Sequence, residues 1–430
     1  MMMNIKKHSS KLVKPFVPTP STLRHYKIGF IDELMPFVNV GVVLYFSTNS
    51  NHDAKFVTRL EKSLEKTLTR FYPLAGRFVN KTLIIDCNDQ GAEFIHAKVN
   101  IKLQDILAPN ANVKFVDDFI PSKKFAIDQF HEPLLAVQVT MFECGGVALG
   151  VNVSHKIVDA STLSTFVTEW AAMNQKENEI ESTGPGFNSS SLFPGRCFSP
   201  LPLQLITEDM SSKYTRMMLS FNESAILKVK AKAMAKENIC TKYYSKVQLV
   251  SSIIWKAFID VDRATNNIPK NYMLLQAVSL RGKTASLIPK NSCGNILAFC
   301  VTEAGNAETS EELADVLTNN VKKTINSFSN VCHDREDGQT TILNYVTLKD
   351  VNIQESTHVL AVTSWSKFPF YEADFGFGKP TWAAPGSVIV QPSAILMDDA
   401  QGNGIDAHFM VEVENIPYFE RALEIISLAD

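Results

Sequence analysis

The sequence predicts a protein that mixes helices and strands over two or three domains. The chain has 430 residues, and a domain typically holds about 150 residues. Hydrophobic residues make up 45% and charged residues 20%, which is ordinary for a globular protein with a sizeable core and excludes global disorder. Apolar residues alternate over 135–153 and then follow helical spacing over 163–170. Strand and helix patterns therefore occur next to each other.

The clearest local structure is a β-hairpin. Apolar residues alternate over 135–141 and again over 147–153, and a Gly-Gly turn separates the two runs. This pattern predicts a hairpin with one buried face. His155 is the next residue on that face. Asp159 lies just before the following helix, where a carboxylate can cap free N–H groups.

Other segments carry weaker patterns of the same kinds. Apolar residues at helical spacing predict helices over 57–71, 221–235, 247–258 (with Ser245 as its cap) and 417–428. Apolar runs predict strands over 83–89, 272–280, 388–390, 394–397 and 405–413. The segment from 176 to 215 is rich in polar residues, Gly, Ser and Pro, which predicts a crossover loop between domains over 1–175 and 216–430.

Composition excludes several classes of function. The net charge is −3, from 42 basic and 45 acidic residues, so no basic excess is available for nucleic acid. No apolar run approaches 18 residues, so no membrane partner is expected. The seven scattered cysteines predict buried, reduced thiols. Neither end carries a secretory or organellar signal, and we expect a cytoplasmic protein without a metal, since no metal-binding motif occurs.

Two segments share the spacing His-x-x-x-Asp. One is His155 with Asp159, in the strand–turn–helix context. A partly buried imidazole near its neutral pKa suits general-base catalysis, and the alternative is a core histidine beside a helix cap. The other is His333 with Asp337, in a charged stretch that predicts a solvated loop without a catalytic role.

The segment 374–380 predicts a fixed irregular loop. Two glycines stand between aromatic residues, and a proline closes the segment. Its Asp-Phe-Gly start also occurs in the metal site of kinases. No Gly-rich loop, strand lysine or His-Arg-Asp segment accompanies it, so the kinase interpretation fails and a structural turn is favoured.

Together these motifs resemble the plant BAHD acyltransferase family over the whole chain. The resemblance rests on His155-x-x-x-Asp159 after a Gly-Gly hairpin and on Asp374-Phe375-Gly376-Phe377-Gly378 before the late strands. Supporting segments are 71–77, 86–91, 294–295 and 363–365. Within the family, the chain most resembles the acetyltransferases of alkaloids and specialised alcohols.

The resemblance implies a fold and an activity. The fold would be α/β, of the chloramphenicol acetyltransferase type, with two similar-sized domains of mixed, largely antiparallel sheets and flanking helices, and with the active-site channel at the domain interface. The activity would be transfer of a short acyl group, expected to be acetyl, from acyl-CoA to a hydroxyl of a plant specialised metabolite. Acyl-CoA would be a co-substrate and not a permanently bound cofactor, and the enzyme would be a monomer.

The resemblance also implies residue roles. His155 matches the catalytic base, and Asp159 matches an orienting residue that pairs with an arginine, for which Arg281 is the candidate. Thr363 and Trp365 match positions that contact the tetrahedral intermediate. Asp374, Phe375, Gly376, Phe377 and Gly378 match a structural loop.

The chain departs from the family pattern in two places. Phe377 replaces the usual tryptophan of the glycine loop, and Lys283 with 286–289 replaces an arginine followed by a proline-rich segment. Two functional alternatives stay open: a catalytically silent relative that binds a ligand, and an acyl-CoA thioesterase that uses water at the same site. A scaffold without any site is a third interpretation.

Overall fold

The computed structural model describes most of the chain and divides it into two compact units. The described residues are 3–47, 55–79, 84–107, 113–121, 132–175, 184–202, 205–207, 210–235, 243–266, 270–349, 351–354, 356–386 and 392–428. Unit 1 comprises 1–202, 289–296 and 368–387, and unit 2 comprises 203–288, 297–367 and 388–430. The predicted domains are continuous stretches, whereas unit 1 also takes two short segments, 289–296 and 368–387, from the second half of the chain.

Unit 1 is built on a six-stranded sheet with the order β1-β6-β7-β8-β3-β15. Its strands are β1 (Ile5–Val13), β3 (Asn39–Phe46), β6 (Ala92–Val99), β7 (Leu135–Met141), β8 (Val147–Ser154) and β15 (Trp382–Gly386). Neighbours are antiparallel except β6 and β7, which are parallel. The predicted hairpin is confirmed as β7 and β8.

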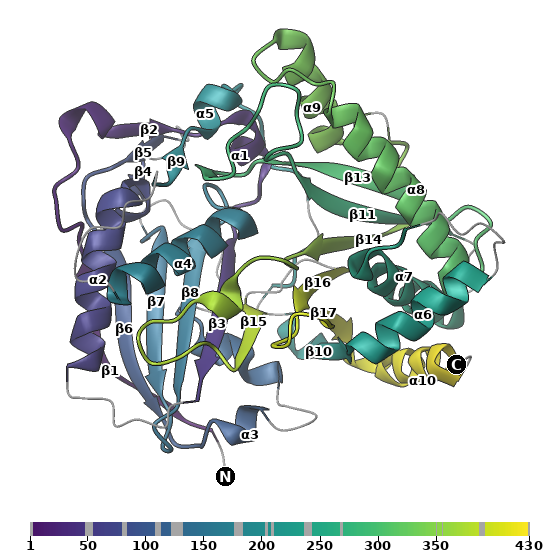
Figure 1. Ribbon diagram of the computed structural model, residues 1–430, viewed down its shortest axis with the longest axis horizontal. Coiled ribbons are helices and arrows are strands. Elements are labelled where there is room, and N and C mark those ends of the chain that lie inside the picture. The colour runs from purple at the N-terminus through teal and green to yellow at the C-terminus, as the bar shows by residue number, and fades with distance from the viewer. Residues whose placement is uncertain are drawn as a thin grey trace. The chain divides into compact units, whose positions relative to one another are not determined.

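Two long helices of unit 1 pack against each other. They are α2 (Phe56–Arg70) and α4 (Ala160–Gln175), and Figure 1 shows α4 crossing in front of β7 and β8. Leu60, Leu64 and Leu68 of α2 are fully buried, which is the apolar stripe that the spacing of 57–71 predicted. The buried Trp170 of α4 donates its indole N–H to Ser63 Oγ at 2.9 Å.

Smaller elements complete unit 1. A three-stranded sheet joins β2 (His25–Lys27), β5 (Ile84–Asp86) and β4 (Arg77–Phe78). The short helices are α1 (Phe30–Leu34), α3 (Gln104–Leu107) and α5 (Ser189–Leu192). A short parallel pair joins β9 (Gly186–Phe187) to β12 (Ser292–Cys293). This pair brings the distant segment 289–296 into unit 1. The predicted crossover loop therefore contains α5 and β9.

Unit 2 has a second six-stranded sheet, in the order β10-β17-β16-β14-β11-β13. Its strands are β10 (Tyr214–Phe221), β11 (Asn271–Ser279), β13 (Leu297–Glu303), β14 (Thr357–Ser364), β16 (Ser393–Asp398) and β17 (Ile405–Glu412). The pairs β11–β14 and β14–β16 are parallel and the others antiparallel. Mixed, largely antiparallel sheets in both units confirm the predicted fold class. The strand predicted over 388–390 lies outside the described residues.

The helices of unit 2 match the sequence patterns only in part. They are α6 (Glu223–Ala235), α7 (Lys246–Thr265), α8 (Ser310–Phe328), α9 (Glu336–Thr347) and α10 (Ile416–Leu428). The predicted cap of α7 is confirmed, because Ser245 Oγ accepts the N–H of Gln248 at 3.2 Å. Helices α6, α7 and α10 were also predicted, whereas α8 and α9 were not.

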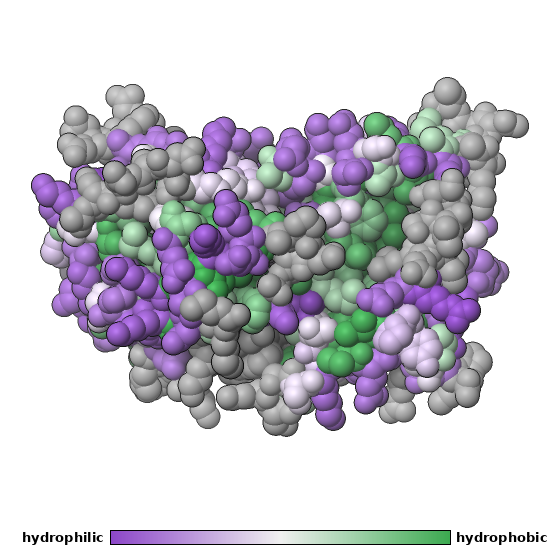
Figure 2. Space-filling view, turned by 90° about the horizontal axis from the view of Figure 1, so that it is seen from below, coloured by the Kyte–Doolittle hydropathy of each residue, from purple (hydrophilic) through white to green (hydrophobic). Residues whose placement is uncertain are grey.

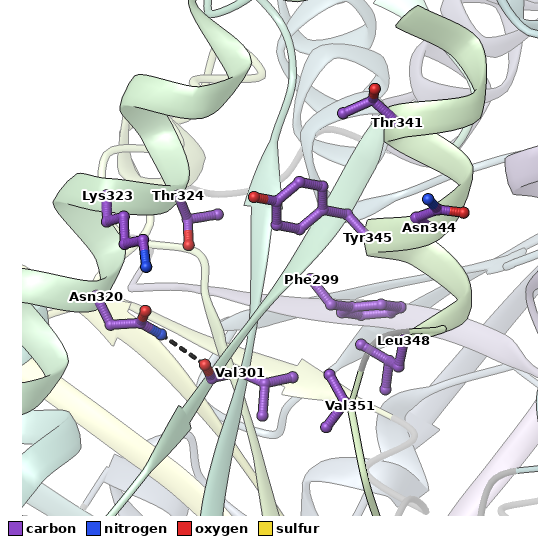
Figure 3. Close-up of a pocket in the computed structure, with 10 residues that line it drawn as sticks. All are labelled: Phe299, Val301, Asn320, Lys323, Thr324, Thr341, Asn344, Tyr345, Leu348 and Val351. Carbon is purple, nitrogen blue, oxygen red and sulfur yellow. Dashed lines mark hydrogen bonds between the residues drawn. The ribbon is translucent and has the colours of Figure 1, made fainter. Parts of the chain in front are cut away.

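A pocket of about 320 Å³ lies in unit 2 between α8, α9 and the edge strand β13. Figure 3 shows Lys323 and Thr324 on α8 opposite Tyr345 on α9. The amide of Asn320 donates to the carbonyl of Val301 at 2.5 Å and so covers the open edge of β13. The residues that line this pocket include no histidine and no carboxylate, so it does not supply a general base.

The surface and the cysteines also bear on the sequence predictions. Figure 2 shows a face on which hydrophilic residues surround smaller hydrophobic areas. Within the described residues, no helix is long and apolar enough to cross a membrane. The six cysteines in this part of the chain are free, and Cys144 and Cys197 are exposed. The expectation that every thiol is buried was wrong for these two.

Candidate active site

His155 follows directly after the last residue of β8. Its backbone N–H donates to the carbonyl of Val38 at 2.8 Å, which extends the pairing of β3 and β8 by one bond. The side chain is partly exposed. Its Nδ1 atom is buried and has no hydrogen-bond partner among the described residues. The hairpin thus holds the backbone of His155 rigidly while part of the imidazole stays accessible.

The surroundings of His155 favour the neutral imidazole. Burial lowers its pKa, and its own carbonyl, the charge of Asp159 and the Asn295 side chain oppose this in part. Because the net shift is downward, the ring is neutral at pH 7 and can accept a proton. The neighbouring Lys156 is fully buried and donates its ammonium to the carbonyl of Glu33 at 2.8 Å.

Asp159 caps α4, as the sequence predicted. Its Oδ1 accepts the N–H of Thr162 at 2.8 Å, and its Oδ2 accepts the N–H of Ile296 at 3.3 Å. The first bond satisfies a free N–H of the helix start, and the second ties the helix to the segment 289–296. The proposed partner Arg281 belongs to unit 2, where its backbone N–H donates to Ser279 Oγ at 3.4 Å. The pairing of Asp159 with Arg281 stays a prediction.

Asn295 and Asp32 lie next to His155 in the fold, and no sequence motif assigned them a role. The amide nitrogen Nδ2 of Asn295 lies 2.7 Å from the carbonyl oxygen of His155 and 2.9 Å from Oδ1 of Asp32. Both residues are completely buried. They lie 140 and 123 positions from His155 in the sequence, so no local pattern could reveal the contact. The pair Gly294-Asn295 was noted only as part of the family resemblance.

Thr363 and Trp365 lie in unit 2, at the end of β14. Thr363 pairs with Ile395 of β16, and the backbone N–H of Trp365 donates to the carbonyl of Leu396 at 2.7 Å. The Trp365 ring is buried. Their contact with a reaction intermediate stays a prediction.

The glycine loop has the geometry of a fixed turn. Oδ1 of Asp374 accepts the N–H groups of Gly376 at 2.7 Å and Gly378 at 3.0 Å. Both glycines have φ in the left-handed region, at 88° and 102°, which other residues rarely adopt. The loop belongs to unit 1, and the amide of Asn174 donates to the carbonyl of Phe375 at 2.6 Å.

The aromatic residues of this loop anchor it to α2, β3 and α4. The Phe375 ring meets the Trp170 ring edge-on with centroids 5.0 Å apart. The Phe377 ring meets the rings of Phe46 and Phe56 edge-on at 4.7 and 4.9 Å. The loop therefore packs on the unit 1 core, and a phenylalanine at 377 supports that packing without an indole N–H.

The second His-x-x-x-Asp segment differs from its prediction. His333 is buried, and its Nδ1 lies 2.7 Å from the hydroxyl of Ser286. Glu336 and Asp337 form the first turn of α9. The prediction of a solvated loop was wrong for His333, because the chain from 331 to 333 hydrogen-bonds to 285–286, including Ala285 N–H to the Val331 carbonyl at 2.9 Å. Residues 334–337 are exposed, as predicted.

One pocket of unit 2 has the charge to hold an anionic group. It has a volume of about 490 Å³, and its lining includes Lys230, Lys246 and Lys367 against one carboxylate, Glu223. It lies at the start of α7, where Ser245 caps the N–H of Gln248. Lys246 is partly neutralised by Asp398 at 2.9 Å. In the described part of the chain, no three metal-binding side chains gather.

Comparisons with known proteins cover nearly the whole chain. The family model described as the Transferase family matches residues 3–426. Vinorine synthase from Rauvolfia serpentina is 32% identical, over 100% of this chain and 99% of its own. Its crystal structure superposes with a TM-score of 0.81 at 31% identity, over 96% of each chain.

Two further relatives are similar over most of their lengths. One is named pelargonidin 3-O-(6-caffeoylglucoside) 5-O-(6-O-malonylglucoside) 4'''-malonyltransferase, from Salvia splendens, and is 32% identical over 98% of this chain and 99% of its own. The other is stemmadenine O-acetyltransferase from Catharanthus roseus, which is 31% identical over 93% of this chain and 92% of its own.

Proposed function

The chain belongs to the plant BAHD acyltransferase family, and from this premise we propose that it transfers an acetyl group from coenzyme A to a hydroxyl of a plant specialised metabolite. That it is an acyltransferase with the two-domain, chloramphenicol acetyltransferase-like fold follows from the family. The acetyl donor and the hydroxyl acceptor are the finer part of the proposal, and relatives named as an O-acetyltransferase and a malonyltransferase support a short acyl group.

The observation that carries the mechanism is the partly exposed imidazole of His155, whose pKa is lowered by burial. An alcohol loses its proton far above pH 7, so its oxygen needs a base as it attacks the thioester carbonyl. His155 takes that proton while the new C–O bond forms. When the C–S bond breaks, the imidazolium returns the proton to the departing thiolate. General-base catalysis of this kind contributes about 10²–10⁴-fold.

Other residues have supporting roles in the proposed reaction. The Trp365 indole N–H and the Thr363 hydroxyl would stabilise the negative oxygen of the tetrahedral intermediate. Asp159 would orient the segment that carries His155, since it ties α4 to Ile296. Neither Cys144 nor Ser154 has the context of a nucleophile elbow. The acyl group therefore passes directly from donor to acceptor, without an acyl-enzyme.

The lysine-lined pocket of unit 2 supports the donor assignment. Coenzyme A carries a pyrophosphate and a further phosphate, and ammonium groups bind phosphates as point charges. We assign Lys230 and Lys367 to these phosphates because both line the pocket at the start of α7. We also propose that the enzyme acts as a cytoplasmic monomer, which light scattering and localisation of a fluorescent fusion would test.

A panel of acyl-CoA donors against candidate alcohols, with detection of products by mass, tests the function. We expect acylated product and free thiol in equal amounts, and only when an acceptor is present. Thiol release without an acceptor would indicate a thioesterase. Ligand binding without thiol release from any donor would indicate a catalytically silent relative. Labelled acyl group retained on the protein would contradict direct transfer.

A further inference from the structure

The pocket between α8, α9 and β13 has no part in the proposed reaction and is lined entirely by residues of unit 2. Its volume of about 320 Å³ is at the lower end of the range for small-molecule sites, which is about 300–1,000 Å³. Figure 3 shows Lys323 on the α8 side of the pocket and Asn344 on the α9 side, with the ring of Tyr345 between them. A small ligand in this pocket would therefore contact both helices.

Contacts within unit 2 hold the walls of this pocket in place. The hydroxyl of Tyr345 lies 2.9 Å from Oγ of Ser327, and its ring meets the ring of Phe328 edge-on with centroids 4.8 Å apart. The hydroxyl of Thr324 donates to Sγ of Cys300 at 3.3 Å. Such walls need little ordering when a ligand binds, which favours affinity.

Two polar side chains of the lining have no partner among the described residues. They are the ammonium of Lys323 and the amide of Asn344. The described lining also includes no carboxylate. An ammonium without a neighbouring carboxylate attracts an anion, and an amide without a partner can donate to or accept from a neutral polar group.

The floor of the pocket is apolar. Phe299 and Val301 belong to β13, and Leu348 and Val351 follow the end of α9. Figure 3 shows these four side chains near one another below the ring of Tyr345. An aromatic ring in the pocket would bury its apolar surface against them.

Leu348 is held in a backbone conformation that leucine rarely adopts. It is the C-terminal cap of α9, with φ of 55° and ψ of 34° in the left-handed region. Glycine or asparagine usually takes this conformation at the end of a helix, because other side chains are strained there. Strained residues of this kind are found at ligand sites. Here the strained residue supplies part of the apolar floor.

We propose that this pocket binds a small hydroxyaryl carboxylate. The carboxylate pairs with the ammonium of Lys323, and the hydroxyl reaches the amide of Asn344. The ring lies between Tyr345 and the floor at Phe299. None of the described lining residues is a histidine or a carboxylate, so the ligand is bound and not converted. This inference does not depend on the proposed acyl transfer.

Other kinds of ligand fit the lining less well. A phosphate monoester carries nearly two negative charges at pH 7, whereas Lys323 is the single cation among the described lining residues. An amine would meet that cation without any carboxylate to bind it. A peptide strand added to the edge of β13 would need the carbonyl of Val301, which already accepts the amide of Asn320.

Isothermal titration calorimetry with 4-hydroxybenzoate tests the ligand class. We expect a Kd of about 0.1–1 mM, which the roughly ten non-hydrogen atoms of this probe allow. The uncharged 4-hydroxybenzamide should bind at least about 10-fold more weakly. Saturating coenzyme A should leave the Kd unchanged, because Lys230 and Lys367 of the proposed donor site do not line this pocket. Equal affinity for the two probes, no binding of either, or displacement by coenzyme A would overturn the proposal.

Lys323→Gln and the matched control Lys322→Gln test the location of the site. Both lysines are exposed on α8, and Lys323 lines the pocket whereas Lys322 does not. Lys323→Gln should weaken 4-hydroxybenzoate about 10-fold, and Lys322→Gln should bind it as the wild-type protein does. Thermal unfolding without ligand should be unchanged in both, since an exposed side chain is replaced. The same Kd in the two variants would show that the probe binds elsewhere.

Leu348→Gly separates the ligand contact from the stability of the fold. Glycine adopts the left-handed conformation without strain, so thermal stability without ligand should stay close to that of the wild-type protein. The apolar contact with the probe is lost, and we expect the Kd for 4-hydroxybenzoate to rise about 3-fold or more. Wild-type affinity in Leu348→Gly would contradict the assigned position of the ring.

Discussion

Two segments of this protein share the spacing His-x-x-x-Asp and differ in nearly everything else. His155 directly follows a buried hairpin strand, and its ring is partly exposed, with no hydrogen bond to Nδ1 among the described residues. His333 is buried with Nδ1 on the hydroxyl of Ser286 at 2.7 Å. Nδ1 of His333 therefore already has a structural partner, whereas Nδ1 of His155 has none among the described residues.

The aspartates of the two segments differ as well. Both oxygens of Asp159 accept backbone N–H groups, from Thr162 and from Ile296. Asp337 is 73% exposed and contacts Arg335 at 3.3 Å. The same four-residue spacing therefore gives a buried helix cap in one place and a solvated ion pair in the other, because the surrounding fold decides which atoms meet.

The largest difference is expected in catalysis. His155→Ala should lower kcat about 10²–10⁴-fold, since general-base catalysis is lost, whereas His333→Ala should leave kcat unchanged. Steady-state rates with matched amounts of folded protein measure both. Equal loss of activity in the two variants would remove the distinction between the segments.

The next difference is expected in stability. Asp159→Ala removes the cap of α4 and leaves the N–H of Ile296 unpaired, which should cost about 2 kcal/mol. Asp337→Ala should change the free energy of unfolding by less than about 0.5 kcal/mol, as exposed ion pairs do. Denaturant unfolding gives both values. A larger loss for Asp337→Ala would show that its ion pair matters more than its exposure indicates.

Ser286→Ala removes the hydrogen-bond partner of His333 and leaves the imidazole itself in place, so it tests the structural role of this contact. The hydroxyl of Ser286 also accepts the backbone N–H of His333 at 2.8 Å, so its removal should cost about 1 kcal/mol. Activity at a temperature well below unfolding should not change. Reduced kcat in a fully folded Ser286→Ala enzyme would connect this segment to the chemistry.

The smallest expected effect lies in the pH dependence. Because burial lowers the pKa of His155, the neutral, active ring persists to lower pH than an exposed histidine allows. The acid limb of kcat/KM should therefore have its midpoint below about 6.5, the usual histidine value. His333→Ala should show the same midpoint. A midpoint above 6.5 in the wild-type enzyme would contradict the lowered pKa.

Sequence patterns predicted elements whose side chains repeat at short range. The hairpin β7–β8 and the helices α2, α4 and α7 were found because their buried faces follow regular spacing. Strand β1 was missed because its residues are nearly all exposed, as suits an edge strand. An edge strand is held by backbone pairing with its neighbour, which leaves no apolar alternation to detect.

The candidate site also has features that the sequence predicted and features that it did not. The place of His155 after a strand and the capping by Asp159 were predictable, since each depends on residues within one strand–turn–helix segment. The contacts of Asn295 with Asp32 and with the carbonyl of His155 were not predictable, because these residues lie more than a hundred positions apart in the sequence. The burial of His333 by Ser286 and the gathering of Lys230, Lys246 and Lys367 also depend on distant contacts.

Local order along the chain was thus enough to predict a mixture of helices and strands, the hairpin and the place of His155 directly after it. Folding in three dimensions decided which polar atoms surround that residue and which of the two His-x-x-x-Asp segments keeps its imidazole partly exposed. The physical reason is the distance along the chain over which each kind of interaction acts. Periodicity and capping act over a few residues, whereas burial and hydrogen-bond satisfaction depend on every segment that packs at the same point.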